Sequence, residues 1–168
     1  MKTLIILATI ALATTVQTHA GISAPLQSTL DKYIVIQAAL AGDSMQGISA
    51  AASDMAATAR ASNGAVPDAV AAQSEVLSKA ADIKAARDAF KPLSASLIAA
   101  LSEQPSVSGG YVEAFCSMAN ASWIQIGEKI ANPYFGSSMA TCGEVRKSFR
   151  GDSKTMPPAK SGMGCCGG

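Results

Sequence analysis

Apolar residues recur every three or four positions between residues 24 and 103, the spacing that places them on one face of an α-helix. The clearest stripe follows Asp82, which suits a helix N-cap. Its members are Ile83, Ala86, Phe90, Leu93, Leu97 and Leu101. Pro92 lies within this stripe and lacks a backbone donor, so we expect a kink or a restart of the helix there.

Three further stripes precede this one. The first starts near Pro25 and ends at Ala41-Gly42. The second starts at Asp43, which with Gln46 resembles a capping box, and the third runs from about Pro67 to Ala80. The inward positions of these three stripes are Leu26, Leu30, Tyr33, Ile34 and Leu40, then Met45, Ile48, Ala52, Met55 and Ala59, then Val70 and Leu77. Four such stripes with short connections predict a mainly α fold, an up-and-down bundle of about four helices.

The pattern changes after residues 102–110, a turn-rich linker. Residues 111–150 contain aromatic, Cys and Met residues without helical periodicity. Residues 111–116 are predicted to form a short strand, and Asn132-Pro133 is a turn signal. We therefore expect residues 21–150 to form a single domain, in which the bundle is followed by a small irregular Cys/Met-containing C-terminal lobe at about 111–146.

The two ends of the chain differ from this domain. Lys2, an apolar run over residues 4–16 and the ending Thr18-His19-Ala20 predict a signal peptide over residues 1–20, cleaved at about Ala20/Gly21. The mature protein is then periplasmic or secreted. The run is shorter than the roughly 20 apolar residues of a membrane span, and we expect no span in the mature chain. Residues 151–168 predict a flexible Gly/Cys/Met tail.

Charge and histidine content exclude several classes of function. The chain has 13 Lys and Arg against 12 Asp and Glu, and removal of Lys2 with the leader balances them, so nucleic acid is not an expected partner. The only histidine, His19, leaves with the leader. The mature chain therefore lacks the residues for a Ser-His-Asp or Cys-His site. It also lacks a Cys-x-x-Cys redox motif, and we expect no enzymatic activity.

Four sulfur residues form the main candidate site. Cys116 and Met118 make one thiolate and thioether pair, and Met139 and Cys142 make a second. Such soft ligands favour Cu(I) or Ag(I) over hard cations, which makes copper or silver the expected cofactor. Trp123 lies between the pairs and would either shield a metal ion from water or belong to the core of the lobe.

A disulfide is the alternative use of these cysteines in a secreted protein. A Cys116–Cys142 bridge would stabilise the lobe by roughly 3 kcal/mol, but it would leave the neighbouring methionines without a role. The tail contains a candidate secondary site at Met163, Cys165 and Cys166. Adjacent cysteines pair with each other only under strain, so this tail would either bind metal or form an intermolecular disulfide.

The same residues resemble a bacterial domain family of unknown function. That family occurs as a stand-alone secreted protein and at the C-terminus of periplasmic adaptor subunits of copper and silver efflux pumps. The resemblance covers about residues 26–146, and Ser117 replaces the family's usual proline. The matching residues are Phe115-Cys116, Met118-Ala119, Trp123, Asn132-Pro133-Tyr134-Phe135-Gly136, Met139, Cys142-Gly143-Glu144-Val145, and in the last helix Asp82, Arg87, Phe90, Leu93 and Ser94.

The resemblance adds heavy-metal handling as the context of the sulfur site. The sequence thus predicts a periplasmic or secreted protein that binds Cu(I) or Ag(I), either buffering the ion or handing it to an efflux system. The expected partner is a copper or silver efflux adaptor or another envelope protein. The alternative is a non-enzymatic interaction module of an efflux or envelope assembly, stapled by a Cys116–Cys142 disulfide.

Overall fold

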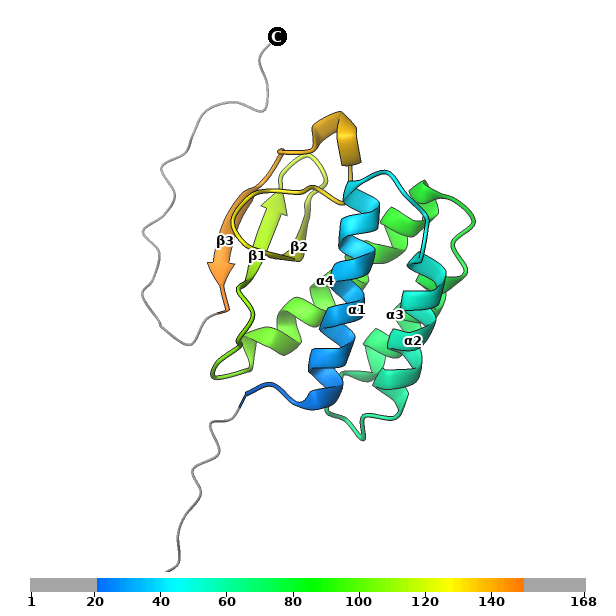
Figure 1. The fold of residues 1–168 in the computed structure, drawn as a ribbon, viewed down its shortest axis with the longest axis vertical. Helices are drawn as coiled ribbons and strands as arrows, with labels where there is room; N and C mark the ends of the chain where they lie inside the picture. Colours follow the sequence, from blue (N-terminus) through cyan, green and yellow to red (C-terminus); the bar gives the residue numbers. More distant parts are fainter. Residues whose placement is uncertain (1–20, 150–168) are drawn as a thin grey trace, which may run out of the picture.

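Four helices come first in the chain, and a small antiparallel sheet follows them (Figure 1). The computed structural model describes residues 21–149. The predicted signal peptide and the predicted tail, with Met163, Cys165 and Cys166, lie outside the described residues. The helices are α1 (Ala24–Ala41), α2 (Ile48–Arg60), α3 (Asp68–Ser78) and α4 (Ile83–Ser102). The prediction of about four helices is therefore confirmed for this part of the chain.

Side chains cap the starts of two helices, and the cap at Asp82 was predicted from sequence. The Ser23 hydroxyl accepts from the backbone N–H of Leu26 at the start of α1. At the start of α4 the Asp82 carboxylate accepts from the backbone N–H of Ala85 at 2.8 Å. Of the two outcomes predicted at Pro92, a kink or a restart, the restart is wrong, because α4 continues through this residue.

Asp43 does not start the second helix, contrary to the capping-box prediction. Helix α2 begins at Ile48, after Gly47, whose φ of 78° is left-handed. Asp43 itself has a φ of 55°, a conformation that Asp tolerates better than most residues. Its carboxylate is occupied by long-range contacts instead of the N–H groups of α2.

Packing of the helices follows chain order, since α1 contacts α2, α2 contacts α3 and α3 contacts α4. Figure 1 shows α4 running obliquely behind α1, and α4 also packs against strand β2 (Ala121–Ile126). Tyr33 of α1 stacks on Phe90 of α4 with ring centroids 4.8 Å apart, and both rings are fully buried. One continuous core therefore extends from the helices into the sheet. Within residues 21–149, none of the helices combines the length and apolarity needed to cross a membrane.

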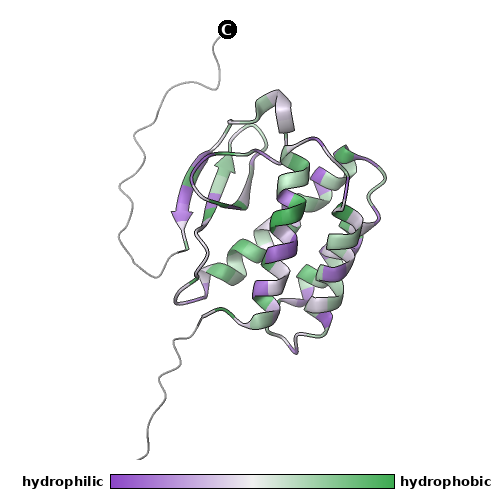
Figure 2. Cartoon of the chain, viewed as in Figure 1, coloured by the Kyte–Doolittle hydropathy of each residue, from purple (hydrophilic) through white to green (hydrophobic). Residues whose placement is uncertain are grey.

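The C-terminal lobe is a regular structure and not the irregular one predicted from sequence. It contains β1 (Tyr111–Cys116), β2, the short 3₁₀ helix η1 (Gly136–Met139) and β3 (Glu144–Ser148). The strands form an antiparallel sheet in the order β2-β1-β3. Period-two burial places Val112, Ala114 and Cys116 inward, whereas β3 is mostly exposed and hydrophilic (Figure 2). Because β3 is mostly polar, the hydrophobic pattern of the sequence did not predict this strand.

Candidate functional site

The two lobe cysteines lie side by side in the interior of the protein. Cys116 is the last residue of β1, and Cys142 precedes β3. The pairing of Phe115 with Glu144 between β1 and β3 brings Cys116 and Cys142 close together. The Sγ atoms are 3.4 Å apart, with 0% of Cys116 and 5% of Cys142 exposed. The structure thus brings together two of the four sulfur residues predicted as a site.

Hydrogen-bond donors surround the sulfur of Cys116. They are the backbone N–H of Ala119, the Asn132 side chain and the backbone N–H of Met118, and the thiols of Cys116 and Cys142 also contact each other, with either sulfur able to donate. Burial opposes ionisation of Cys116, but these hydrogen bonds together outweigh it and lower the pKa of the Cys116 thiol below its ordinary value of 9.0. Because thiolates are the form that binds soft metals, a lowered pKa makes the ligating form of Cys116 easier to reach than that of an ordinary thiol.

The two methionines of the predicted site lie nearer the surface than the cysteines. Met118 is 56% exposed and lines a pocket of about 270 Å³ beside α4, together with Lys91 and Tyr134. Met139 ends η1, is partly buried against the core, and accepts the backbone N–H of Cys142 through its carbonyl at 3.0 Å. The backbones of both methionines therefore support the cysteine pair, while the thioether of Met118 faces a surface pocket.

Trp123 closes the site on one side. Its indole is fully buried, and its N–H donates to the side-chain oxygen of Gln125 at 2.9 Å. A Cβ added to Gly143 would come 2.7 Å from the Trp123 ring, so the ring packs directly on the backbone that follows Cys142. Trp123 also contacts Tyr134 edge-on, with centroids 5.9 Å apart. The indole thus belongs to the core of the lobe and at the same time covers the residue next to Cys142.

Asn132 organises the loop that carries Cys142. Its side-chain oxygen accepts the backbone N–H groups of Tyr134 at 2.9 Å and Phe135 at 3.3 Å, and its amide nitrogen donates to the Cys142 carbonyl at 2.7 Å. Its backbone N–H donates to the Ala140 carbonyl at 3.0 Å. The sequence indicated a turn here and included Asn132 in the resemblance, but it did not reveal the partners of the side chain, because they become neighbours only in the folded loop.

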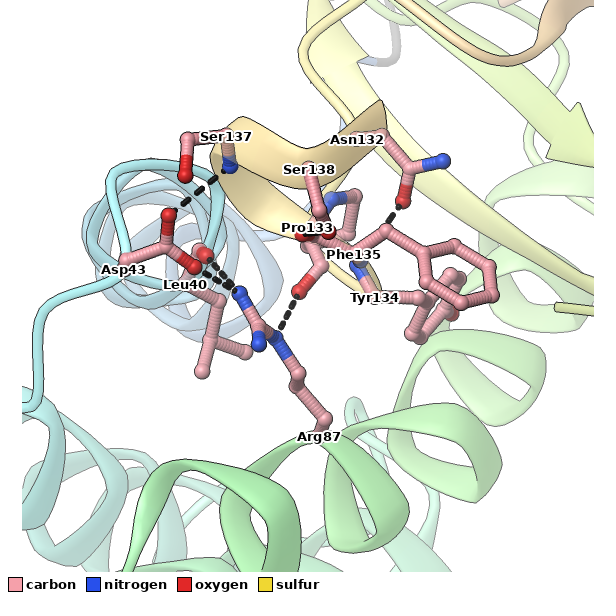
Figure 3. A network of polar contacts seen from close by, with 9 residues as sticks. All are labelled: Leu40, Asp43, Arg87, Asn132, Pro133, Tyr134, Phe135, Ser137 and Ser138. Carbon is pink, nitrogen blue, oxygen red and sulfur yellow. Dashed lines mark hydrogen bonds and ion pairs between the residues drawn. The ribbon is translucent and has the colours of Figure 1, made fainter. Parts of the chain in front are cut away.

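A second polar network, which the sequence reading did not assign to the site, fastens this loop to the helices (Figure 3). Arg87 of α4 donates to the carbonyls of Pro133 and Leu40, each at 2.9 Å, and to the Asp43 carboxylate at 2.6 Å. The other Asp43 oxygen accepts the backbone N–H of Ser137 at 2.8 Å. These contacts join the end of α1, the middle of the lobe loop and the first half of α4.

Hydrogen bonds set the ionisation of Asp43. The hydrogen bond from Ser137 is the largest cause, and the hydrogen bond from Arg87 follows; together they lower the pKa of Asp43 to about 2. Gly136, with a φ of 56°, lies directly under this ion pair, and a Cβ there would overlap the Asp43 carboxylate and the Arg87 guanidinium. A signal was present in the sequence, since Gly136 and Arg87 are both part of the resemblance, but their contact was not foreseeable from spacing.

Comparison of the chain with protein families, with curated proteins and with solved structures found no match. Within residues 21–149, no group of three or more His, Cys, Asp or Glu side chains is placed to hold a metal ion. The ligands that the site offers are sulfur atoms: the adjacent thiols of Cys116 and Cys142, with the thioethers of Met118 and Met139 in the flanking segments.

Proposed function

We propose that this protein is a non-enzymatic, periplasmic or secreted binding protein for Cu(I) or Ag(I). It buffers the ion or hands it to an efflux system. The supporting observation is the pair of buried cysteine sulfurs, 3.4 Å apart, with N–H donors around one of them. Soft thiolate ligands select these monovalent ions, and burial protects a bound ion from water.

The donor set fits a soft ion in two respects. Cys116 and Cys142 supply two thiolates to one point, and the hydrogen bonds to Cys116 more than offset the effect of burial on its charged form. Met118 and Met139 complete the proposed ligand set, with the exposed thioether of Met118 as the group that an arriving ion meets first. An efflux adaptor or another envelope protein is the proposed partner for transfer.

The test is an anaerobic Cu(I) competition titration of the reduced mature protein against a chromophoric chelator. The starting protein carries Cys165→Ser and Cys166→Ser, which removes the tail thiols while leaving the chain at full length. One tight equivalent is expected, and it should disappear when Cys116 and Cys142 are also changed to Ser. Retention of that equivalent in the four-serine protein would contradict the site.

The role of the thioethers is tested separately with matched leucine variants. Met118→Leu with Met139→Leu should weaken Cu(I) binding about tenfold and preserve the fold, because Leu and Met have similar volumes. Met45→Leu with Met55→Leu is the control, since Met55 is fully buried within the helices and Met45 packs against the same core. Equal Cu(I) affinity of the two double variants would remove the methionines from the ligand set.

A second candidate function rests on the same short Sγ to Sγ distance. A Cys116–Cys142 disulfide would staple β1 to β3, and the protein would then act as an interaction module of an efflux or envelope assembly. Counting the thiols in freshly isolated protein separates the two functions. Full oxidation of both cysteines, with no metal binding after mild reduction, would favour the stapled module.

A further inference from the structure

The side chain of Asn132 is completely buried, and its orientation is set by its neighbours. Its oxygen accepts two backbone N–H groups, from Tyr134 and Phe135, so the amide nitrogen must face the opposite way. There it donates to the Cys142 carbonyl at 2.7 Å and to the sulfur of Cys116. A reversed amide would place N–H against N–H at Tyr134 and Phe135, which burial makes costly.

One side chain therefore touches both halves of the cysteine pair, the sulfur of Cys116 and the backbone of Cys142. Two backbone N–H groups, from Met118 and Ala119, approach the same sulfur from the turn after β1. This turn is closed by the Asn120 N–H, which donates to the Ser117 carbonyl at 3.1 Å. The donors thus come from two separate segments and converge on one atom.

This arrangement matters most when two thiolates share one monovalent ion. Such a complex carries a net charge of −1, and an uncompensated charge is costly in a buried site. N–H donors aimed at the ligating sulfur reduce that cost without adding a competing ligand. Groups that hydrogen-bond to metal ligands also keep those ligands oriented.

We propose that Asn132 is the positioning residue of the sulfur site: it holds Cys142 against Cys116 and stabilises the negative charge that two thiolates retain around one monovalent ion. The inference rests on the proposed function, because it assigns a role within Cu(I) or Ag(I) binding. Asn132 itself is not a metal ligand.

The test is Asn132→Asp, measured by Cu(I) competition in the tail-serine protein. The carboxylate accepts from Tyr134 and Phe135 as the amide oxygen does, but it cannot donate to Cys116 or to the Cys142 carbonyl. Cu(I) affinity should fall about 10- to 100-fold, the usual effect of losing a group that supports a metal ligand. Circular dichroism checks that the variant is folded.

The matched control is Asn63→Asp, which adds the same charge away from the site, in the turn between α2 and α3. Asn63 is exposed, and its φ of 51° suits Asp. Its variant should bind Cu(I) within about twofold of the parent protein. Equal affinities for folded Asn132→Asp and Asn63→Asp would overturn the role of Asn132.

A measurement on the parent protein covers the case in which Asn132→Asp does not fold. In a ¹⁵N-labelled sample, one equivalent of Ag(I) should shift the Asn132 side-chain amide signals and the backbone amides of Met118 and Ala119 more than those of the helices. Ag(I) binding that leaves these three donors unshifted would overturn the inference while preserving the proposed function. No binding of Cu(I) or Ag(I) by the parent protein would overturn both.

Discussion

Different kinds of interaction stabilise the helical region and the C-terminal lobe. Buried residues of α1 to α4 are mainly apolar and follow helical periodicity. The loop between β2 and β3 is instead held by hydrogen bonds from side chains to backbone, made chiefly by Gln125, Asn132 and Arg87. Burial of apolar area is non-directional, whereas hydrogen bonds specify positions. The candidate site lies in the C-terminal lobe, where hydrogen bonds fix the positions of individual groups.

The two regions are nevertheless joined through shared residues. The hydroxyl of Tyr33 accepts the backbone N–H of Ile124 at 3.1 Å and is hydrogen-bonded to Ser94 at 2.7 Å. Phe90 packs between Tyr33 and Tyr134, at centroid distances of 4.8 and 6.2 Å. We therefore expect the regions to unfold together but to respond differently to local changes.

Phe90→Ala is expected to have the largest effect, because it removes a fully buried ring that contacts both regions. The loss should be about 3–5 kcal/mol of unfolding free energy. Urea unfolding followed by circular dichroism for the helices and by Trp123 fluorescence for the lobe should show one common transition. Val76→Ala, at a residue 63% exposed, is the control and should change stability by less than about 0.5 kcal/mol. Two separate transitions in the parent protein would contradict a single cooperative unit.

Oxidation of Cys116 and Cys142 should stabilise the lobe at the expense of metal binding. By loop entropy, a bridge across this separation contributes roughly 3 kcal/mol relative to the reduced protein. Urea unfolding of oxidised and reduced tail-serine protein measures the difference. The Cys116→Ser, Cys142→Ser variant in the same background should give the same stability with and without oxidant. A stability unchanged by oxidation of the parent would show that the pair cannot close without distortion.

Gly136→Ala tests the contact between the lobe loop and the Asp43–Arg87 ion pair. The left-handed φ alone should cost roughly 1–2 kcal/mol, and overlap of the new Cβ with the ion pair should add to this. Gly127→Ala is the control, because its φ of 77° is also left-handed but no atom lies within 4 Å of the added Cβ. The difference in unfolding free energy between the two variants, measured by urea unfolding, gives the cost of this overlap. Equal losses of unfolding free energy would show that the ion pair moves aside without cost.

The pH dependence of Asp43 should be the smallest effect. Its pKa in the folded protein is about 2, below the ordinary 3.8, so its contribution is fully present above pH 3.8 and is lost as the pH falls through 2. The backbone amide signal of Ser137 should follow this titration with a midpoint near pH 2. Asp43→Asn should abolish the change, and a midpoint near 3.8 in the parent protein would contradict the hydrogen bonds to Ser137 and Arg87.

The sequence predicted correctly those elements whose structure is decided by the residue pattern of the element itself. The stripe from Ile83 to Leu101 predicted α4, and Asp82 caps it as expected. The prediction failed at Asp43, which had two possible uses: a cap for a nearby helix or an ion pair with Arg87. Only the approach of α4 and the lobe loop makes the second use available.

The candidate site shows the same division. The sequence predicted that Cys116 and Cys142 share a site, and the folded chain places their sulfurs together, whereas metal binding stays a prediction. Asn132 was predicted as part of a turn and of the resemblance but was not assigned to the site, because amide side chains are common in turns and its partners lie in other segments. The strand β3 was missed because an edge strand with one polar face lacks a strong apolar pattern.

The sequence by itself determined the four helices, the boundary at which the helical pattern ends, and the presence of four sulfur residues in the lobe. These properties depend on residue type and on spacing within short segments. The tertiary structure decided which polar groups meet: Arg87 with Asp43 and Pro133, and Asn132 with both cysteines. The reason is that a hydrogen bond requires two groups within about 3 Å, and this condition depends on the packing of all the elements between them.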